Sequence, residues 1–289
     1  MFKITPFQNH PNNFFCNKSI DQKYQCLSWK LLLIPISIIT ILYAFLLLNH
    51  VVKDVQYIQF QKNWFLFLNK KLSYLDDFQL NITQFGDAFI FLSCLSVLIK
   101  SSPRLWKSLF FTLIFGGIFS KILKECFKIP RPAEYFGTKS FVIVGCENFG
   151  FSSLPSGHSI TVFSILTVLF FSFLPKPNNK KILYVLGLSL FGLLVALSRV
   201  AVGAHYPLDT IFGGLIGIVC GIIGILVSNK VNIPFSVNSI KNQWILLSLL
   251  FVSTIIILFK FSEEQLFVYF ICLTCLFYAI YGFFKNICS

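Results

Sequence analysis

Charged residues are scarce in this chain. Only 12% of its 289 residues are Asp, Glu, Lys or Arg, and only 11 are acidic. Soluble domains average about 25% charged residues, so an ordinary water-soluble protein is excluded. Apolar residues take the place of the missing charge: 56% are hydrophobic, 36 are Phe, and the mean hydropathy is +0.76. The natural solvent for such a chain is lipid.

The chain also lacks a basic stripe and any motif that reads DNA or RNA. Its net charge is +13, but the lysines and arginines are scattered in short clusters between apolar runs. Nucleic acid is therefore not an expected partner, and the charges are interpreted as topology signals. A dense carboxylate cluster is missing too, which disfavours a two-metal hydrolase. We predict no metal and no cofactor.

Eight nearly uncharged runs predict an all-α, polytopic membrane protein. The first run lacks the cleavage site of a signal peptide, so we expect a retained span. We divide the chain into an N-terminal segment (1–30), a six-span core (31–228) and two additional C-terminal spans (within 229–289). The predicted spans are 31–49, 86–100, 106–123, 158–174, 182–197, 207–228, 244–259 and 265–284.

Glycines within three of these runs predict close contacts between helices, because a missing side chain lets helix backbones approach in lipid. We expect packing rather than a cofactor role for them. They are Gly116, Gly117, Gly187, Gly192, Gly213, Gly214, Gly217, Gly221 and Gly224.

Short basic loops set the predicted orientation. Cations precede the third and fifth spans, and such loops stay in the cytoplasm. They are Lys100, Arg104, Lys107, Lys176, Lys180 and Lys181. Both termini are then cytoplasmic, and the segments 50–85, 124–157 and 198–206 lie outside. In a bacterium this predicts a multi-pass protein of the inner (cytoplasmic) membrane whose polar loops face the periplasm.

Three outer segments collect ionisable groups that a membrane chain normally avoids. Lys124, Arg131 and Arg199 supply three cations, and guanidinium groups match phosphate oxygens in a bidentate way. Ser156 and Gly157 precede a predicted helix, whose free N–H groups favour an anion. Lysine side chains at the ends of spans usually extend to the membrane–water interface, where they help to set the topology. The coincidence of these groups on one side favours an anion site instead.

Two histidines accompany these cations. His205 and Asp209 are spaced i, i+4 across the predicted start of a helix at Pro207, so the carboxylate can orient the imidazole. The other nitrogen is then free to attack phosphorus. His158, from a different loop, is placed to protonate a leaving oxygen. Taken singly, each histidine could merely cap a helix; taken together they indicate catalysis.

Three ordered motifs resemble the signature of the type 2 phosphatidic acid phosphatase superfamily. They are Lys124-x6-Arg131-Pro132, Pro155-Ser156-Gly157-His158 and Ser198-Arg199-x5-His205-x3-Asp209. The resemblance covers residues 85–228. It implies a six-helix membrane core, no metal requirement, and removal of phosphate from a lipid phosphate or diphosphate at the outer leaflet.

The resemblance also implies roles for individual residues. His205 is expected to be the nucleophile, Asp209 its orienting carboxylate and His158 the general acid. The expected phosphate cradle consists of Lys124, Arg131, Ser156, Gly157 and Arg199. Two features depart from the family core: the two C-terminal apolar runs, and a long stretch between Pro132 and Pro155. Residues 141–144 in that stretch could cover a bulky amphiphile, or pack as a short strand or loop.

Several alternatives stay open at this point. We favour lipid A as substrate, with undecaprenyl diphosphate, phosphatidylglycerophosphate and phosphatidate as competitors. A lipid phosphotransferase would use the same residues, whereas an anionic-lipid transporter or scaffold would need no catalysis. The expected partners are thus membrane lipids, and no oligomeric state is predicted. Cys126 and Cys146 share the outer loop, where free thiols are expected ahead of a disulfide.

Overall fold

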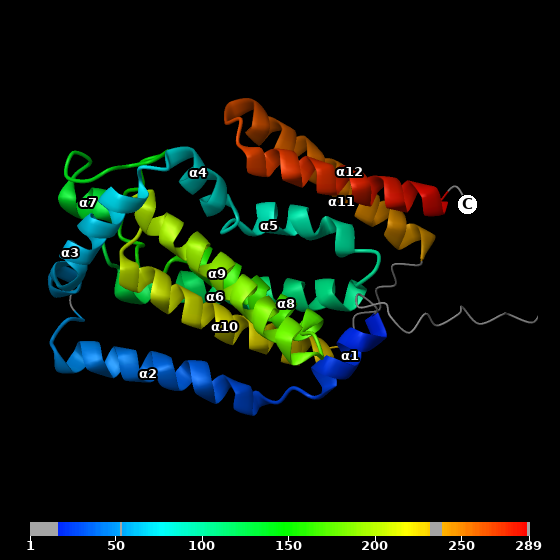
Figure 1. The fold of residues 1–289 in the computed structure, drawn as a ribbon, viewed down its shortest axis with the longest axis horizontal. Coiled ribbons are helices and arrows are strands. Elements are labelled where there is room, and N and C mark those ends of the chain that lie inside the picture. Colours follow the sequence, from blue (N-terminus) through cyan, green and yellow to red (C-terminus); the bar gives the residue numbers. More distant parts are fainter. Residues whose placement is uncertain (1–16, 53, 232–238, 288–289) are drawn as a thin grey trace, which may run out of the picture.

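The computed structural model describes residues 17–52, 54–231 and 239–287, and over these residues the chain is all-helical, which confirms the predicted fold class. A helix occupies each of the eight predicted spans (Figure 1). Residues 1–16 of the expected N-terminal segment lie outside the described residues. The helices at the predicted spans are α2 (Leu33–Leu48), α5 (Ala88–Leu95) continued by η2 (Ser96–Leu98), α6 (Pro103–Phe127), α8 (Gly157–Phe173), α9 (Asn178–Ala201), α10 (Pro207–Lys230), α11 (Ile240–Glu263) and α12 (Phe267–Ile287).

Five of these helices are long and apolar enough to cross a bilayer. They are α2 together with the 3-10 turn η1 (Trp29–Leu32), and α9, α10, α11 and α12. A sixth candidate is the pair formed by α4 (Asp76–Gln84) and α5 with η2, which is bent by 76°. The helix α8 is apolar but has only 17 residues. The count of eight spans therefore stays a prediction.

The centre of the bundle is α10, which packs against α8 and α6. Its glycines make this possible: a Cβ added to Gly213 would lie 2.6 Å from the Ser156 carbonyl oxygen, and one on Gly217 would lie 2.6 Å from that of Ile160. The predicted close contacts are confirmed there. They are wrong for Gly117 and Gly187, because nothing lies within 4 Å of a Cβ at either position.

The predicted outer segment 50–85 is helical rather than irregular. It forms α3 (Asp54–Leu72) and α4, and the expected loop 124–157 contains the short helix α7 (Pro132–Phe136). Figure 1 shows α3 crossing one end of the bundle instead of running along it. A further helix, α1 (Asn17–Gln25), lies at the opposite end.

The C-terminal helices α11 and α12 form a hairpin that packs on α5 through α12 (Figure 1). Its apolar core joins Ile90 of α5 to Leu250 and Tyr269. The Sγ atoms of Cys94 and Cys272 lie 3.4 Å apart within this contact, and both cysteines are free. This hairpin lies on the side of the bundle away from α2.

All three sequence motifs meet at one end of the bundle, the left end in Figure 1. α6 and α9 end there, whereas α8 and α10 begin there. The N-termini of α8 and α10 therefore present free N–H groups to the same region, and their dipoles favour negative charge in it. The fold thus assembles the candidate site from segments that are far apart in the sequence.

Candidate active site

The site centres on the turn that joins α9 to α10. His205 lies in this turn and Asp209 in the first turn of α10, and His205 Nδ1 is 3.5 Å from Asp209 Oδ2. Both side chains are almost completely buried, with 2% and 0% of their area exposed. The predicted i, i+4 partnership is thus present in the structure. In this arrangement the His205 Nδ1 atom faces the Asp209 carboxylate, and the Nε2 atom takes no part in the contact.

Three donors hold the Asp209 carboxylate in place. Tyr57 donates its hydroxyl to Oδ1 at 2.8 Å, Ser153 donates its hydroxyl to Oδ2 at 2.6 Å, and the Tyr206 N–H donates to Oδ2 at 2.9 Å. These donors belong to α3, to the loop before α8 and to the start of α10. A buried carboxylate needs such donors to stay ionised.

Ser156 and Gly157 begin α8, as predicted. Ser156 is the N-cap: its Oγ accepts from the Ser159 N–H at 3.4 Å, and its own N–H donates to the Asp209 carbonyl oxygen at 3.0 Å. A Cβ on Gly157 would lie 3.6 Å from Lys124 Nζ. The Lys124 ammonium group therefore lies against the bare backbone at the helix start, which is the arrangement that an anion requires.

The two arginines are held by neutral groups. Arg199 Nη1 donates to Thr83 Oγ1 at 2.6 Å, while its buried Nε has no hydrogen-bond partner among the described residues. Arg131 donates through Nη1 to the Ala204 carbonyl oxygen at 3.4 Å and through Nε to Ser152 Oγ at 3.3 Å. Arg199 lies in the last turn of α9 and not in a loop as expected. Both guanidinium groups thus keep their charge available for a ligand.

His158 lies in the first turn of α8, opposite the bend between α4 and α5. It is within electrostatic range of His205, Lys124, Arg131 and Arg199. A Cβ on Gly86, at that bend, would lie 2.5 Å from His158 Cβ and 2.6 Å from Cδ2. Only glycine leaves room for the imidazole here, because real Cβ atoms do not approach so closely.

Burial and positive neighbours control protonation at the centre of the site. Desolvation, followed by Arg131, Arg199 and Lys124, lowers the pKa of His205 well below its ordinary value of 6.5, although a hydrogen bond with the Ser153 backbone acts in the opposite direction. Burial also lowers the pKa of Arg131, and Asp209 opposes this shift. His205 is therefore a neutral imidazole at pH 7, the form that carries a nucleophilic lone pair.

The helix α3 supports the site in a way that sequence reasoning missed. Besides Tyr57, its buried Gln61 accepts from the Leu208 N–H at 2.9 Å. Its buried Asn69 donates to the carbonyl oxygens of Val200 and Ala201 at 3.2 and 3.0 Å. These contacts satisfy the backbone at the end of α9 and the start of α10.

The segment 141–144 packs on the site as a loop. Asn69 exchanges hydrogen bonds with Val142 at 2.8 and 2.9 Å, and the Val144 N–H donates to the Val202 carbonyl oxygen at 3.4 Å. Gly203, at φ +78°, sits so close to Phe141 that a Cβ would lie 2.5 Å from its ring. Residues 141–144 therefore pack against the protein as a loop, which is one of the two roles that the sequence left open for them. Cys126 and Cys146 nearby are free thiols.

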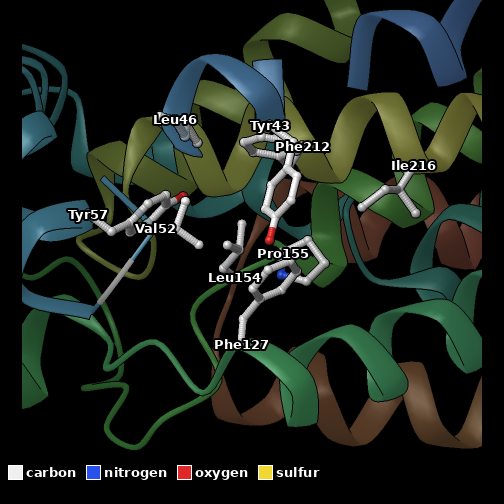
Figure 2. A pocket seen from close by; sticks show the side chains of 9 residues that line it. All are labelled: Tyr43, Leu46, Val52, Tyr57, Phe127, Leu154, Pro155, Phe212 and Ile216. Carbon is white, nitrogen blue, oxygen red and sulfur yellow. The ribbon is translucent and has the colours of Figure 1, made fainter. Parts of the chain in front are cut away.

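An apolar cavity of about 30 Å³ adjoins the site (Figure 2). It lies between α2, α3 and α10, and the Tyr57 ring forms part of its wall while its hydroxyl reaches Asp209. Pro155, the residue before Ser156, forms another part. The full lining is Tyr43, Leu46, Val52, Tyr57, Phe127, Leu154, Pro155, Phe212 and Ile216. An apolar space of this kind suits hydrocarbon better than water.

The structure brings all eight predicted site residues to one end of the bundle. They are Lys124, Arg131, Ser156, Gly157, His158, Arg199, His205 and Asp209. Among the described residues there is no group of three or more His, Cys, Asp or Glu side chains placed to hold a metal ion. The roles of the individual residues stay predictions. Tyr57, Gln61, Asn69, Thr83, Gly86 and Ser153 are the supporting residues that the motifs did not indicate.

The fold and the site together define a helical membrane protein that concentrates cations and two histidines at one end of its bundle. A PAP2 superfamily model matches residues 105–233. The lipid A 1-phosphatase of Rhizobium etli is 30% identical over 171 residues, which are 49% of this chain and 68% of that enzyme. The chain belongs to the PAP2 superfamily, within its membrane lipid phosphatase branch.

Other relatives differ in name and coverage. The lipid A 1-phosphatase of Rhizobium johnstonii is 34% identical over 110 residues, but these are 36% of this chain and only 40% of that enzyme. Phosphatidylglycerophosphatase B of Bacillus subtilis is 29% identical over 157 residues, 50% of this chain and 71% of the enzyme. The crystal structure of Aquifex aeolicus LpxE is similar with a TM-score of 0.49 and 27% identity, covering 57% of this chain and 94% of that one.

Proposed function

We propose that this protein removes a phosphate group from a membrane lipid through a phosphohistidine intermediate. One observation carries the proposal: a buried imidazole, His205, is paired with Asp209 and surrounded by three cations at the end of a membrane bundle. A neutral histidine among permanent positive charges is poorly suited to bind a cation. It is well suited to attack a phosphate whose negative charge the cations stabilise.

In the first step, His205 Nε2 attacks phosphorus while Asp209 stabilises the positive charge that develops on the ring. The bond to the leaving oxygen breaks, and His158, which is protonated once the bound phosphate offsets the charge of the neighbouring cations, donates its proton to that oxygen. The lipid alcohol, or a lipid monophosphate if the substrate is a diphosphate, departs. Lys124, Arg131, Arg199, the Ser156 hydroxyl and the Gly157 N–H bind the nonbridging phosphate oxygens.

In the second step, water attacks the phosphohistidine. His158, now neutral, takes a proton from the water as the new P–O bond forms, and the P–N bond to His205 breaks. Inorganic phosphate leaves, and both histidines return to their starting forms. No metal ion enters this scheme, so we expect activity in the presence of a chelator.

A lipid is the substrate class best supported by the surroundings of the site. The cavity beside Tyr57 is apolar, and its outer wall is α2, a helix whose membrane-length segment is only 11% buried. The relatives named above act on lipid A or on phosphatidylglycerophosphate, judging by their names. We favour lipid A, with phosphatidylglycerophosphate, undecaprenyl diphosphate and phosphatidate as alternatives.

The proposed location follows from the charge of the loops. Lys180 and Lys181 are exposed at the start of α9, at the end of the bundle opposite to the site. The positive-inside rule then places that end in the cytoplasm and the site at the outer leaflet of the inner membrane. Both termini are cytoplasmic in this topology.

The decisive experiment measures phosphate release from purified protein in EDTA with each of the four lipids. Wild type is compared with His205→Asn, and with His50→Asn as a matched control, because His50 is exposed and lies outside the site. We expect His205→Asn to lose at least about 10³-fold in kcat/KM. Equal rates for His205→Asn and wild type would reject the nucleophile. The ranking of kcat/KM among the four lipids would confirm or replace lipid A.

Trapping separates the proposed hydrolysis from phosphotransfer. Quenching a reaction of ³²P-labelled lipid with denaturant should leave acid-labile label on wild type and none on His205→Asn. Label that passes to a second lipid rather than to water would instead assign a phosphotransferase. Lipid binding without any release by wild type would favour the transporter or scaffold alternative.

A further inference from the structure

The helix α3 has an unusual distribution of side chains. Its buried face carries the polar residues Tyr57, Gln61 and Asn69 beside the apolar Ile58 and Phe65, and its exposed face carries large aromatic residues. Trp64 is 61% exposed and Phe67 is 62% exposed. A helix that covers a protein in water exposes polar residues rather than large aromatic ones.

The exposed aromatic residues form a continuous stripe. Phe60, Trp64, Phe67 and Lys71 follow one another at steps of three or four residues, which places them along one side of α3, and Tyr74 follows in the turn after the helix ends at Leu72. All five are exposed, and Tyr74 reaches 88%. The rings of Phe60 and Trp64 contact each other with centroids 6.4 Å apart. We call these five residues the α3 stripe.

The α3 stripe continues a surface that faces lipid. Phe45, near the end of α2, is 50% exposed and contacts the Phe60 ring with centroids 6.5 Å apart. α2 is long and apolar enough to cross the bilayer, and only 11% of its membrane-length segment is buried, so its outer side must meet lipid chains. The stripe therefore starts where the lipid-facing surface of α2 ends.

The charged residues of α3 indicate how deep the stripe lies in the membrane. α3 has 19 residues, enough to span a bilayer, but it is not among the helices apolar enough to do so. Lys70 and Lys71 line a shallow groove with Phe67 and Tyr74. The next acidic residues along the chain, Asp76 and Asp77, are exposed at the start of α4. Aromatic rings beside ammonium groups are typical of the headgroup layer of a membrane.

We propose that the α3 stripe lies in the headgroup layer of the leaflet nearest the active site, with Lys70 and Lys71 on the phosphates of anionic lipids. α3 crosses the end of the bundle, as a helix in the plane of the membrane surface must (Figure 1). Its other face holds Asp209 through Tyr57. In this arrangement one face of α3 contacts the membrane surface and the other face contacts the active site.

Fluorescence quenching in lipid nanodiscs tests the depth directly. The chain has four tryptophans, so replacing Trp29, Trp106 and Trp244 by Phe leaves Trp64 as the only one. We expect lipids brominated near the headgroup to quench Trp64 about twofold more than lipids brominated at the chain end. A variant with Phe251→Trp in a background without other tryptophans, in the middle of α11, is the control for a deep position.

Three outcomes would overturn the proposal. Quenching of Trp64 by aqueous iodide alone would show a stripe in water. Strongest quenching by chain-end bromines would show a stripe in the hydrocarbon core. Protection from all quenchers would show that protein covers it. The measurement uses no turnover, so it does not depend on the proposed phosphatase activity.

The lysine contacts have their own test with the same Trp64 reporter. Brominated phosphatidylserine should quench more than brominated phosphatidylcholine at equal mole fraction, because two lysines enrich anionic lipid locally by about fivefold or more. Lys70→Gln with Lys71→Gln should abolish the difference. Lys180→Gln with Lys181→Gln, at the other end of the bundle, should preserve it. Equal quenching by both lipids in the wild-type lysine background would reject the lysine contacts.

Discussion

The positively charged side chains at the two ends of the bundle have different interaction partners. At the end where α1 packs, Arg104 Nε lies 2.6 Å from Asp21 Oδ1. Lys23 Nζ donates there to the carbonyl oxygens of Ser172 and Leu174 at 2.9 and 3.1 Å. Those carbonyls end α8, so the cation compensates the negative end of a helix dipole. These charges are engaged within the protein.

At the site end, the cations are not engaged in this way. Among the described residues, Lys124, Arg131 and Arg199 have no carboxylate within 4.0 Å, and the two arginines donate hydrogen bonds to hydroxyl and carbonyl oxygens. The buried carboxylate of Asp209 is occupied by Tyr57 and other donors. Unbalanced buried charge is costly, and proteins retain it where a ligand supplies the opposite charge.

The largest effect is expected from removing charge at the site end. Arg131→Gln should lower kcat/KM by about 10²- to 10³-fold, because a donor to the developing oxyanion is lost. It also removes a cation that lowers the pKa of His205. That pKa then rises, His205 becomes protonated at higher pH, and the acid limb of the kcat/KM profile moves upward in pH.

A matched cation serves as the control for Arg131. Lys128 lies in the same loop but is exposed, so Lys128→Gln should change neither the rate nor the pH profile. Measuring kcat/KM from pH 4 to 9 for the three proteins checks both statements. A downward shift of the acid limb in Arg131→Gln would contradict the assigned electrostatics.

A smaller loss is expected from Gly86→Ala, which tests shape instead of charge. The added Cβ would lie 2.5 Å from His158 Cβ, so the imidazole must move. We expect kcat to fall by about 10²-fold, since small displacements of catalytic groups have such effects. Gly117→Ala meets nothing within 4 Å and is the matched control. It should keep full activity, and equal losses in both variants would argue against a specific role for Gly86.

The difference between Gly86 and Gly117 shows where sequence reasoning stops. The motifs predicted which residues meet, because His205 and Asp209 are one helical turn apart and Gly157 begins a helix. The motifs do not indicate which side of a helix faces a neighbouring helix. For this reason the expectation that Gly117 lies at a helix–helix contact is wrong. The apolar run 86–100 predicts Gly86 as the first residue of a span, whereas it lies at the bend before α5.

The helix α3 escaped prediction for a related reason. Its charged and polar residues resemble a loop when only apolar runs are sought. The spacing of Tyr57, Gln61 and Asn69 by multiples of four was the available signal, because it places all three on one face. What they bind depends on tertiary contacts with α9 and α10, and no local pattern contains that information.

Tyr57→Phe should have a moderate effect, because it removes one donor to Asp209 and keeps the ring. Supporting groups of this kind typically contribute about 10- to 100-fold. We expect the loss to be in kcat with little change in KM, since Tyr57 contacts the orienting carboxylate and not the phosphate cradle. Tyr43→Phe, in the same cavity wall, is the control. A change in KM alone would assign Tyr57 to substrate binding instead.

The smallest effect on catalysis is expected at the α1 end. Arg104→Gln removes the ion pair with Asp21 together with hydrogen bonds to the Ser228 carbonyl oxygen and to Asn229 Oδ1. The two ion-paired side chains are 16% and 42% exposed, so the pair itself contributes about 1 kcal/mol or less after solvent screening. Tm should fall by a few degrees, at about 2–4 °C per kcal/mol, while kcat/KM stays within about twofold of wild type. Asp21→Asn keeps the other hydrogen bonds of Arg104 and should lower Tm less, and the double variant should lose no more than Arg104→Gln alone. If Arg104→Gln instead lowered kcat/KM as far as Arg131→Gln, the two ends would not differ in function, and the charge balance would reflect packing alone.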